Sequence, residues 1–172
     1  NTSDTSVGIS GSNEIVSYSL QAGHYSTDGV SAIHNKSSSS YNPDRDGYRN
    51  DSLSGSLAVR PTSGHEIGIN FLASDGTSRY DSTPKARDFK SDQDVAAYSI
   101  YSRNKLHQNW TSTVRLGRST DDLTTLRSGT KLSEFNTTQD QFSWQNDIKP
   151  PVGTALLAAE YLRQTVDSTT NY

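Results

Sequence analysis

One acidic segment of the sequence has the residue types and spacing of a metal site. Asp44 and Asp46 lie two positions apart and are followed by Gly47, and Asp81 belongs to what reads as the neighbouring hairpin. Carboxylates at positions i and i+2 can point at one ion, while the glycine permits a sharp turn. Calcium takes about six to eight oxygen ligands, mostly from carboxylates and carbonyls. These residues therefore predict a calcium site, and the alternative is a turn whose charges are solvated.

The other reactive residue types do not form groups. The chain has no Cys, which excludes disulfides, cysteine-based zinc sites and thiol catalysis. The four histidines lie apart without metal-ligand spacing, at His24, His34, His65 and His107. The sequence has no Gly-x-Ser-x-Gly elbow for a nucleophile and no phosphate-binding glycine loop. We therefore expect neither an enzyme nor a covalently bound cofactor.

The composition restricts the elements that can carry a metal site. Only 30% of the 172 residues are hydrophobic, and 46 residues are Ser or Thr. Globular proteins contain about 45–50% apolar residues, so the composition does not support a conventional soluble core. The net charge of −3 does not fit a general nucleic-acid binder, which has a basic face. The longest purely apolar run, Ala155–Ala159, is far shorter than the ~20 residues of a membrane-spanning helix.

Apolar residues recur at every second position in eight segments, which is the period of a β-strand with one apolar and one polar face. The first segment is the weakest and carries Val7 and Ile9. The apolar positions of the other seven fall within residues 16–22, 53–59, 67–73, 96–100, 110–116, 142–144 and 155–161. A disordered polar chain would not show this regularity. The sequence thus predicts an all-β protein of about eight antiparallel strands.

The connections between these segments alternate between short and long. Residues 11–14, 61–64, 103–109 and 149–153 read as short turns, whereas residues 26–50, 74–92 and 119–137 read as long polar loops. Short periplasmic turns, long extracellular loops and strands of about 10 residues are typical of an up-and-down transmembrane barrel. We therefore expect part of such a barrel in the outer membrane of a Gram-negative bacterium. The alternative is a soluble β-sandwich with one wet face.

This interpretation assigns a role to each face of the strands. The apolar phase is predicted to face lipid at Val16, Tyr18, Leu57, Val59, Ile67, Ile69, Val114, Leu116, Leu157 and Tyr161. The opposite phase is expected to face a polar lumen, and it includes Ser17, Ser56, Asn70, Thr113 and Glu160. Trp110 and Trp144 lie near short turns, where an interfacial aromatic girdle belongs. Both chain ends would lie on the outer side, so we expect eight consecutive strands of a larger barrel.

Three loop motifs resemble those of a known family. The motifs Ser26-Thr27-Asp28-Gly29-Val30, Asp44-Arg45-Asp46-Gly47-Tyr48 and Arg79-Tyr80-Asp81 are similar to segments of the TonB-dependent outer-membrane transporters, and most closely of the cobalamin receptors. The resemblance covers essentially the whole chain. It implies that residues 1–172 form a partial barrel domain, about the first third of a barrel of about 22 strands. The plug domain and the remaining strands of the family would lie outside this chain.

The resemblance also implies a site and a function. In cobalamin receptors the first long loops bind calcium and help to hold the substrate, which carries over to Asp28, Asp44, Asp46, Tyr80, Asp81 and Asp88 as metal ligands. The implied function is TonB-energised uptake of a cobalamin-type corrinoid, with calcium as the cofactor. The implied partners are the corrinoid, the lipid bilayer and, through the plug domain, the TonB complex. The alternatives are a receptor for a ferric siderophore or heme, and a secreted or surface β-rich adhesion module.

Overall fold

The computed structural model describes residues 1–84 and 87–169, and within them it contains strands and no helix. The strands are β1 (Thr2–Ser12), β2 (Val16–Thr27), β3 (Tyr48–Thr62), β4 (His65–Tyr80), β5 (Phe89–His107), β6 (Trp110–Arg127), β7 (Thr130–Ile148) and β8 (Ala155–Ser168). Every segment with the predicted two-residue period lies in one of them. The strands range from 11 to 19 residues, so each is longer than the length predicted from the sequence.

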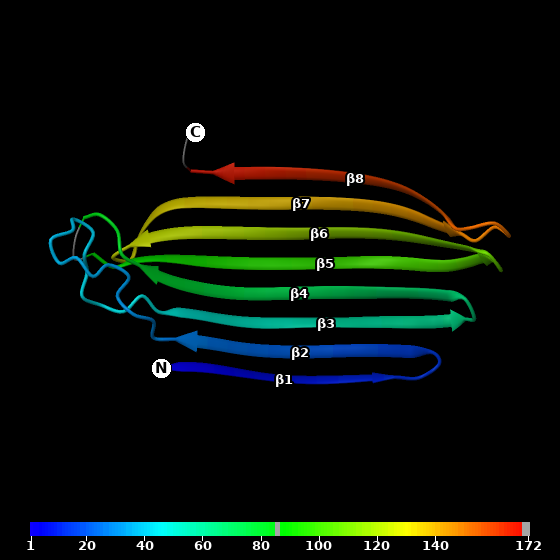
Figure 1. Cartoon of the computed structure of the whole chain (residues 1–172), viewed down its shortest axis with the longest axis horizontal. Coiled ribbons are helices and arrows are strands. Elements are labelled where there is room, and N and C mark those ends of the chain that lie inside the picture. Colours follow the sequence, from blue (N-terminus) through cyan, green and yellow to red (C-terminus); the bar gives the residue numbers. More distant parts are fainter. Residues whose placement is uncertain (85–86, 170–172) are drawn as a thin grey trace.

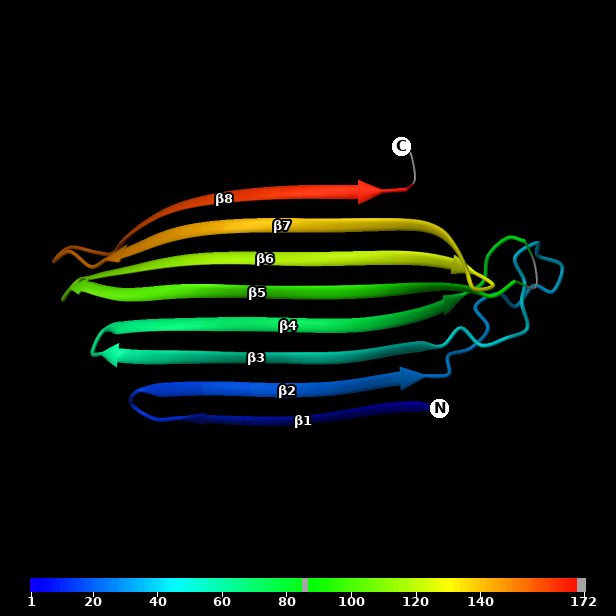
Figure 2. The same cartoon turned by 180° about the vertical axis from the view of Figure 1, so that it is seen from behind.

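The eight strands form one antiparallel sheet in chain order, from β1 at one edge to β8 at the other (Figure 1). Each connection is therefore a hairpin between neighbouring strands, and the view from behind shows the same order (Figure 2). Within the described residues β1 and β8 do not pair, so the sheet is open. The predicted all-β, up-and-down antiparallel architecture is confirmed. The start of β1 and the end of β8 lie at the same end of the sheet as the longer loops.

One face of the sheet is apolar and exposed. Cross-strand register joins a continuous apolar row across seven strands, formed by Tyr18, Leu57, Ile69, Ile100, Leu116, Phe142 and Tyr161. Because side chains alternate along a strand, the ten residues predicted to face lipid all lie on this face. Ile69 is 46% exposed and Leu116 is 54% exposed, although both lie near the middle of the sheet. This apolar face is therefore left without a covering layer in the described part of the chain.

The opposite face is polar and less exposed. The Ser19 and Ser56 hydroxyls lie 2.7 Å apart, and the Asn70 amide donates a hydrogen bond to the Ser99 hydroxyl at 3.3 Å. Ser56, Asn70 and Ser99 are half-buried, whereas the apolar residues beside them along the strands are exposed. A soluble protein places its apolar side chains on the more buried side. In this sheet the polar face is the more buried one, which is the reverse of the arrangement in a soluble protein.

One predicted loop is wrong. Residues 119–137 were expected to form a long polar loop, but they continue β6 and β7 to a tight turn at Ser128 and Gly129. Both turn residues have positive φ, 48° and 81°, as in the type I′ turn that matches the twist of a hairpin. Polar side chains occupy both faces of these strand ends. The apolar period that marks a strand is therefore missing from the sequence, although the backbone pairing continues.

The other predicted loops are shorter than expected. Of residues 26–50 and the described part of 74–92, only residues 28–47, 81–84 and 87–88 leave the sheet. The short connections lie where they were predicted. The connection predicted at residues 103–109 is only a two-residue turn, at Gln108 and Asn109. In the described ranges, no helix has the length and hydropathy needed to cross a membrane.

Candidate metal centre

The loop between β2 and β3 is folded back against the end of β2. Gly29 has a φ of 63°, and a Cβ added there would collide with the carbonyl oxygen of Asp46. Only glycine adopts this backbone without strain and allows so close an approach. The Asp46 N–H donates to the Val30 carbonyl at 3.2 Å, and the Arg79 N–H donates to the Gly47 carbonyl at 2.9 Å. These contacts bring the Asp44–Gly47 segment next to the end of β4.

Three carboxylates meet at this point. One oxygen from each of Asp44, Asp46 and Asp81 lies within 4.8 Å of the other two. All three residues are half-buried. The Asp44 Oδ1 and Asp81 Oδ2 atoms are buried and accept no hydrogen bond from a described residue. A buried carboxylate oxygen without a partner is costly, and a cation between the three side chains would remove that cost.

The electrostatics of the cluster also favour a cation. Burial raises the pKa of the Asp46 carboxyl, and the charges of Asp81 and Asp44 raise the pKa further. The hydrogen bond from the Ala32 N–H to Asp46 Oδ2, at 2.6 Å, acts in the opposite direction and lowers this pKa. That bond also fixes the orientation of the carboxylate. The protein therefore holds three like charges close together.

The donor set fits calcium. Three carboxylates supply up to about six oxygen ligands if each binds through both atoms, and backbone carbonyls of the two loops can add more. The group contains no nitrogen or sulfur ligand, which transition metals such as zinc prefer. Asp44 and Asp46 come from the β2–β3 loop, and Asp81 comes from the β4–β5 loop. A bound ion would therefore join two connections that are distant in sequence.

The structure brings together three of the six residues predicted as ligands. Asp28 is not part of the group, since its carboxylate pairs with Arg45 at 3.3 Å and with the amino group of Asn1 at 3.0 Å. The Tyr80 ring packs against Phe89, with 5.8 Å between ring centroids. For Asp28 and Tyr80, the assignment as metal ligands stays a prediction.

Asp88 lies near the group but outside it. It shares a cavity of about 220 Å3 with Asp44, Arg79 and Lys90, and its backbone carbonyl accepts a hydrogen bond from the Ser128 N–H at 2.7 Å. The turn between β6 and β7 therefore supports the β4–β5 loop from the side. The role of Asp88 as a metal ligand stays a prediction.

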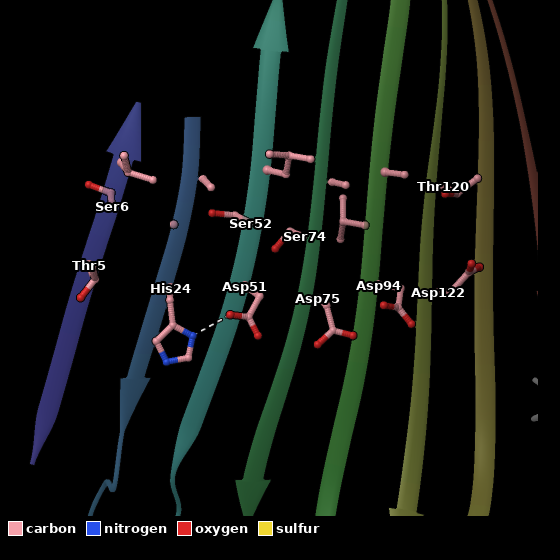
Figure 3. A pocket seen from close by; sticks show the side chains of 17 residues that line it. Thr5, Ser6, His24, Asp51, Ser52, Ser74, Asp75, Asp94, Thr120 and Asp122 are labelled. Carbon is pink, nitrogen blue, oxygen red and sulfur yellow. Dashed lines mark hydrogen bonds and ion pairs between the residues drawn. The ribbon is translucent and has the colours of Figure 1, made fainter. Parts of the chain in front are cut away.

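Sequence reasoning missed a second polar feature, on the apolar face and toward the loop end. Cross-strand register aligns His24, Asp51, Asp75, Asp94 and Asp122 in one row across β2 to β6 (Figure 3). His24 Nδ1 lies 2.6 Å from Asp51 Oδ1. Each of these residues occupies the apolar phase of its strand, which is a signal in the sequence. Only the register shows that they stand side by side.

No known protein-family model matches the sequence, and no curated protein matches it. The three-carboxylate group and the reversed sheet therefore have to be interpreted from their own geometry.

Proposed function

We propose that this chain forms part of the wall of an outer-membrane barrel that takes up a ligand, with a calcium site in its outer loops. The observation that carries the proposal is the reversed burial of the sheet. Its continuous apolar row is exposed, while its serine and asparagine face is half-buried. A transmembrane barrel has an apolar band toward lipid and a polar interior, which is the same arrangement.

The strand lengths and the tryptophans support a membrane position. A transmembrane strand needs about 9–11 residues, and every strand of the sheet is at least that long. The Trp110 indole donates to the Asn146 side chain at 3.0 Å, and the Trp144 indole donates to the Ser112 hydroxyl at 2.9 Å. Both indoles lie on the apolar face toward the short turns. Amphipathic rings at that level are typical of the membrane–water interface.

The loops at the opposite end support a receptor. Calcium at Asp44, Asp46 and Asp81 would tie the β2–β3 loop to the β4–β5 loop and form an ordered outer platform. The resemblance to the cobalamin receptors makes a cobalamin-type corrinoid the substrate that we propose. Uptake would be energised through TonB, by a plug domain that lies outside this chain. In this proposal the chain itself performs no covalent chemistry.

Membrane insertion is tested with the full chain and phosphatidylcholine vesicles. We expect the chain to float with the vesicles after urea extraction, and we expect lipids with brominated acyl chains to quench the fluorescence of Trp110 and Trp144. A chain that stays monomeric in plain buffer and does not associate with vesicles would overturn the barrel wall and favour a soluble β-module.

Calcium and substrate are tested separately by calorimetric titration. We expect calcium binding by the reconstituted chain, and its loss in the double variant Asp44→Ala and Asp46→Ala. The matched control is Asp4→Ala with Glu14→Ala, which removes two exposed carboxylates elsewhere. Titration of the protein that contains the complete barrel with cyanocobalamin, a ferric siderophore and heme then identifies the ligand. Binding of either iron compound in preference to cyanocobalamin would overturn the corrinoid assignment.

A further inference from the structure

A groove of about 700 Å3 lies at the loop end of the sheet and is lined by three arginines. Its charged lining residues are Arg45, Arg49, Arg79 and one carboxylate, Asp28. Hydroxyl groups of Ser26, Thr27 and Thr77 complete the polar lining. This local excess of positive charge is unexpected in a chain with a net charge of −3. The groove therefore has the composition of an anion site.

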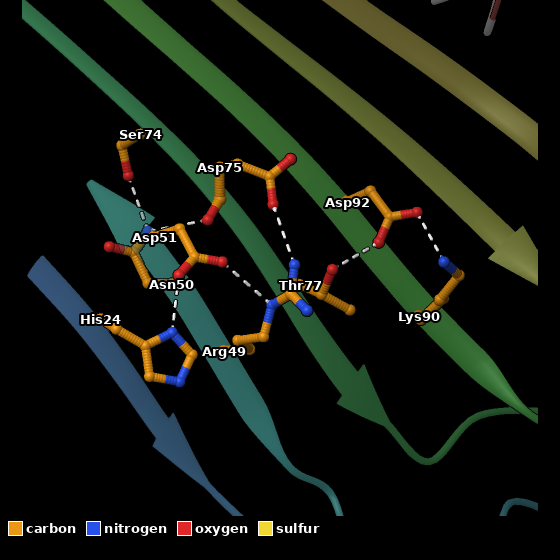
Figure 4. A network of polar contacts seen from close by, with 9 residues as sticks. All are labelled: His24, Arg49, Asn50, Asp51, Ser74, Asp75, Thr77, Lys90 and Asp92. Carbon is orange, nitrogen blue, oxygen red and sulfur yellow. Dashed lines mark hydrogen bonds and ion pairs between the residues drawn. The ribbon is translucent and has the colours of Figure 1, made fainter. Parts of the chain in front are cut away.

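Ion pairs orient the guanidinium groups of Arg45 and Arg49, and all three arginines keep N–H donors for a further ligand. Arg49 Nε lies 3.2 Å from Asp51 Oδ2, and its Nη2 atom lies 3.8 Å from Asp75 Oδ1, as Figure 4 shows. Arg45 pairs with Asp28, and Arg79 forms no ion pair with a described residue. A guanidinium has five N–H donors, so one or two ion pairs leave most of them available. Arg45 and Arg49 are 67% and 59% exposed.

Two of the three arginines of the groove lie on the same face as the apolar rows. Arg49 is separated from Leu53 and Leu57 by an even number of residues, so it lies on the same face of β3. By the same reasoning, Arg79 lies on the same face of β4 as Ile69. Arg49 is four residues beyond Leu53, which is about 13 Å along the strand. The polar headgroup layer extends about 5–8 Å beyond the hydrocarbon on each side of a bilayer. With Leu53 taken as the edge of the hydrocarbon, a tilt of about 45° leaves Arg49 about 9 Å above it, and its long side chain can bring the guanidinium to headgroup depth, while Arg79 lies two residues further out.

The row of carboxylates sets the depth of a bound anion. Asp51 and Asp75 lie between the arginines and the apolar rows, together with Asp94 of the next strand. A phosphate lying deeper than the arginines would be repelled by these carboxylates. Arg79 lies two residues beyond Thr77, the cross-strand partner of Arg49, and both arginines line the groove, so both guanidinium groups can donate hydrogen bonds to a phosphate bound in it.

We propose that this groove binds the phosphate group of a membrane lipid from the side of the protein, at the outer end of the strands. The inference rests on the proposed membrane function, because the apolar rows must contact the acyl chains for the headgroup to reach the arginines. The bound lipid would be a phosphomonoester lipid, whose exposed doubly charged phosphate suits two arginines. The groove would thereby fix the depth of the outer loops relative to the membrane surface.

The experiment uses the full chain in phosphatidylcholine bilayers that contain a small fraction of a photoreactive lipid. One sample carries photoreactive phosphatidic acid, and the other carries photoreactive phosphatidylcholine with the same reactive group near the headgroup. The yield of lipid adducts is mapped by peptide mass spectrometry. The variant is Arg49→Gln with Arg79→Gln. The matched control is Arg103→Gln with Arg127→Gln, which removes two exposed arginines from the opposite face.

We expect phosphatidic acid to label the peptides around residues 45–49 and 77–79 several-fold more than phosphatidylcholine does. Near a membrane surface each basic residue contributes about fivefold to anion attraction, so the double variant should lose the preference for phosphatidic acid, and the control should keep it. Equal labelling by the two lipids, or equal loss in both variants, overturns the inference, while flotation of the chain with the vesicles still supports the barrel wall. A chain that does not float with the vesicles overturns both the inference and the proposed function.

Discussion

Replacing Ile69 by arginine should destabilise the protein far more than the same replacement at Asn70. Ile69 lies in the middle of the apolar row, between Leu57 and Ile100 on the neighbouring strands. Asn70 is the next residue along β4, and alternation points its side chain to the polar face. The two positions are adjacent in sequence and lie at nearly the same place along the strand. They differ only in the face that receives the new charge.

The expected cost follows from the environment of each face. An arginine on the lipid side near the bilayer midplane costs about 2–4 kcal/mol, which lowers the ratio of folded to unfolded protein by roughly 30- to 700-fold. At Asn70 the variant loses the hydrogen bond to the Ser99 hydroxyl, which contributes about 1 kcal/mol. The new guanidinium there faces serines and can be solvated. The difference between the two variants should therefore be about 1–3 kcal/mol.

Urea unfolding in phosphatidylcholine vesicles measures this difference, with the fluorescence of Trp110 and Trp144 as the readout. Leu116→Arg and Gly117→Arg provide a second adjacent pair on β6, with Leu116 in the same apolar row. Equal destabilisation of the two members in both pairs would refute the assignment of faces. A larger loss at Asn70 than at Ile69 would reverse the assignment of the two faces.

Three further predictions concern the loops. Since the pKa of Asp46 is raised above its usual 3.8, protons compete with calcium as the pH falls toward that raised value, so the calcium affinity measured by calorimetry should decrease as the pH is lowered from neutral. Without calcium, the stability of the loop should depend on pH in the opposite direction. Neutral Asp46 stabilises the folded loop below pH 3.8, and this contribution is lost as the pH rises through the raised pKa of Asp46. Amide hydrogen exchange of the loop would detect the change. Gly29→Ala should displace the Asp46 backbone and weaken calcium binding at least tenfold, whereas Gly23→Ala within β2 should leave calcium affinity unchanged. Gly129→Ala should cost about 1–2 kcal/mol in urea unfolding through its φ of 81° alone, because no atom lies within 4 Å of the added Cβ; an unchanged stability would contradict the type I′ turn.

The candidate metal site was predictable in part. The spacing of Asp44 and Asp46 before Gly47 is a local pattern, and it predicted two members of the carboxylate group. Asp81 was predicted as the third member from its place in the neighbouring hairpin, and it joins the other two through contacts that no local pattern contains, such as the hydrogen bond from the Arg79 N–H to the Gly47 carbonyl. The Ala32 N–H that orients Asp46 carries no side-chain signal at all. Backbone groups can orient a metal-binding side chain only after the loop has folded.

The sequence by itself determined the secondary structure and the two faces of the sheet. Alternation along one strand is a local property, because successive side chains point to opposite sides whatever the strand pairs with. Residues such as Leu57 and Ile69 therefore identified the apolar face without any tertiary information. The same reasoning failed at residues 119–137, where polar side chains on both faces of the paired strands remove the period on which it depends.

Only the tertiary structure decided which residues stand side by side across strands. Register is set by hydrogen bonds between segments far apart in the chain, and a shift of one residue would move every side chain to the other face. The row from His24 to Asp122 and the placement of Arg49 near Arg79 both depend on that register. A single strand contributes one residue to each row. The charged side chains therefore form a row only once the neighbouring strands have paired.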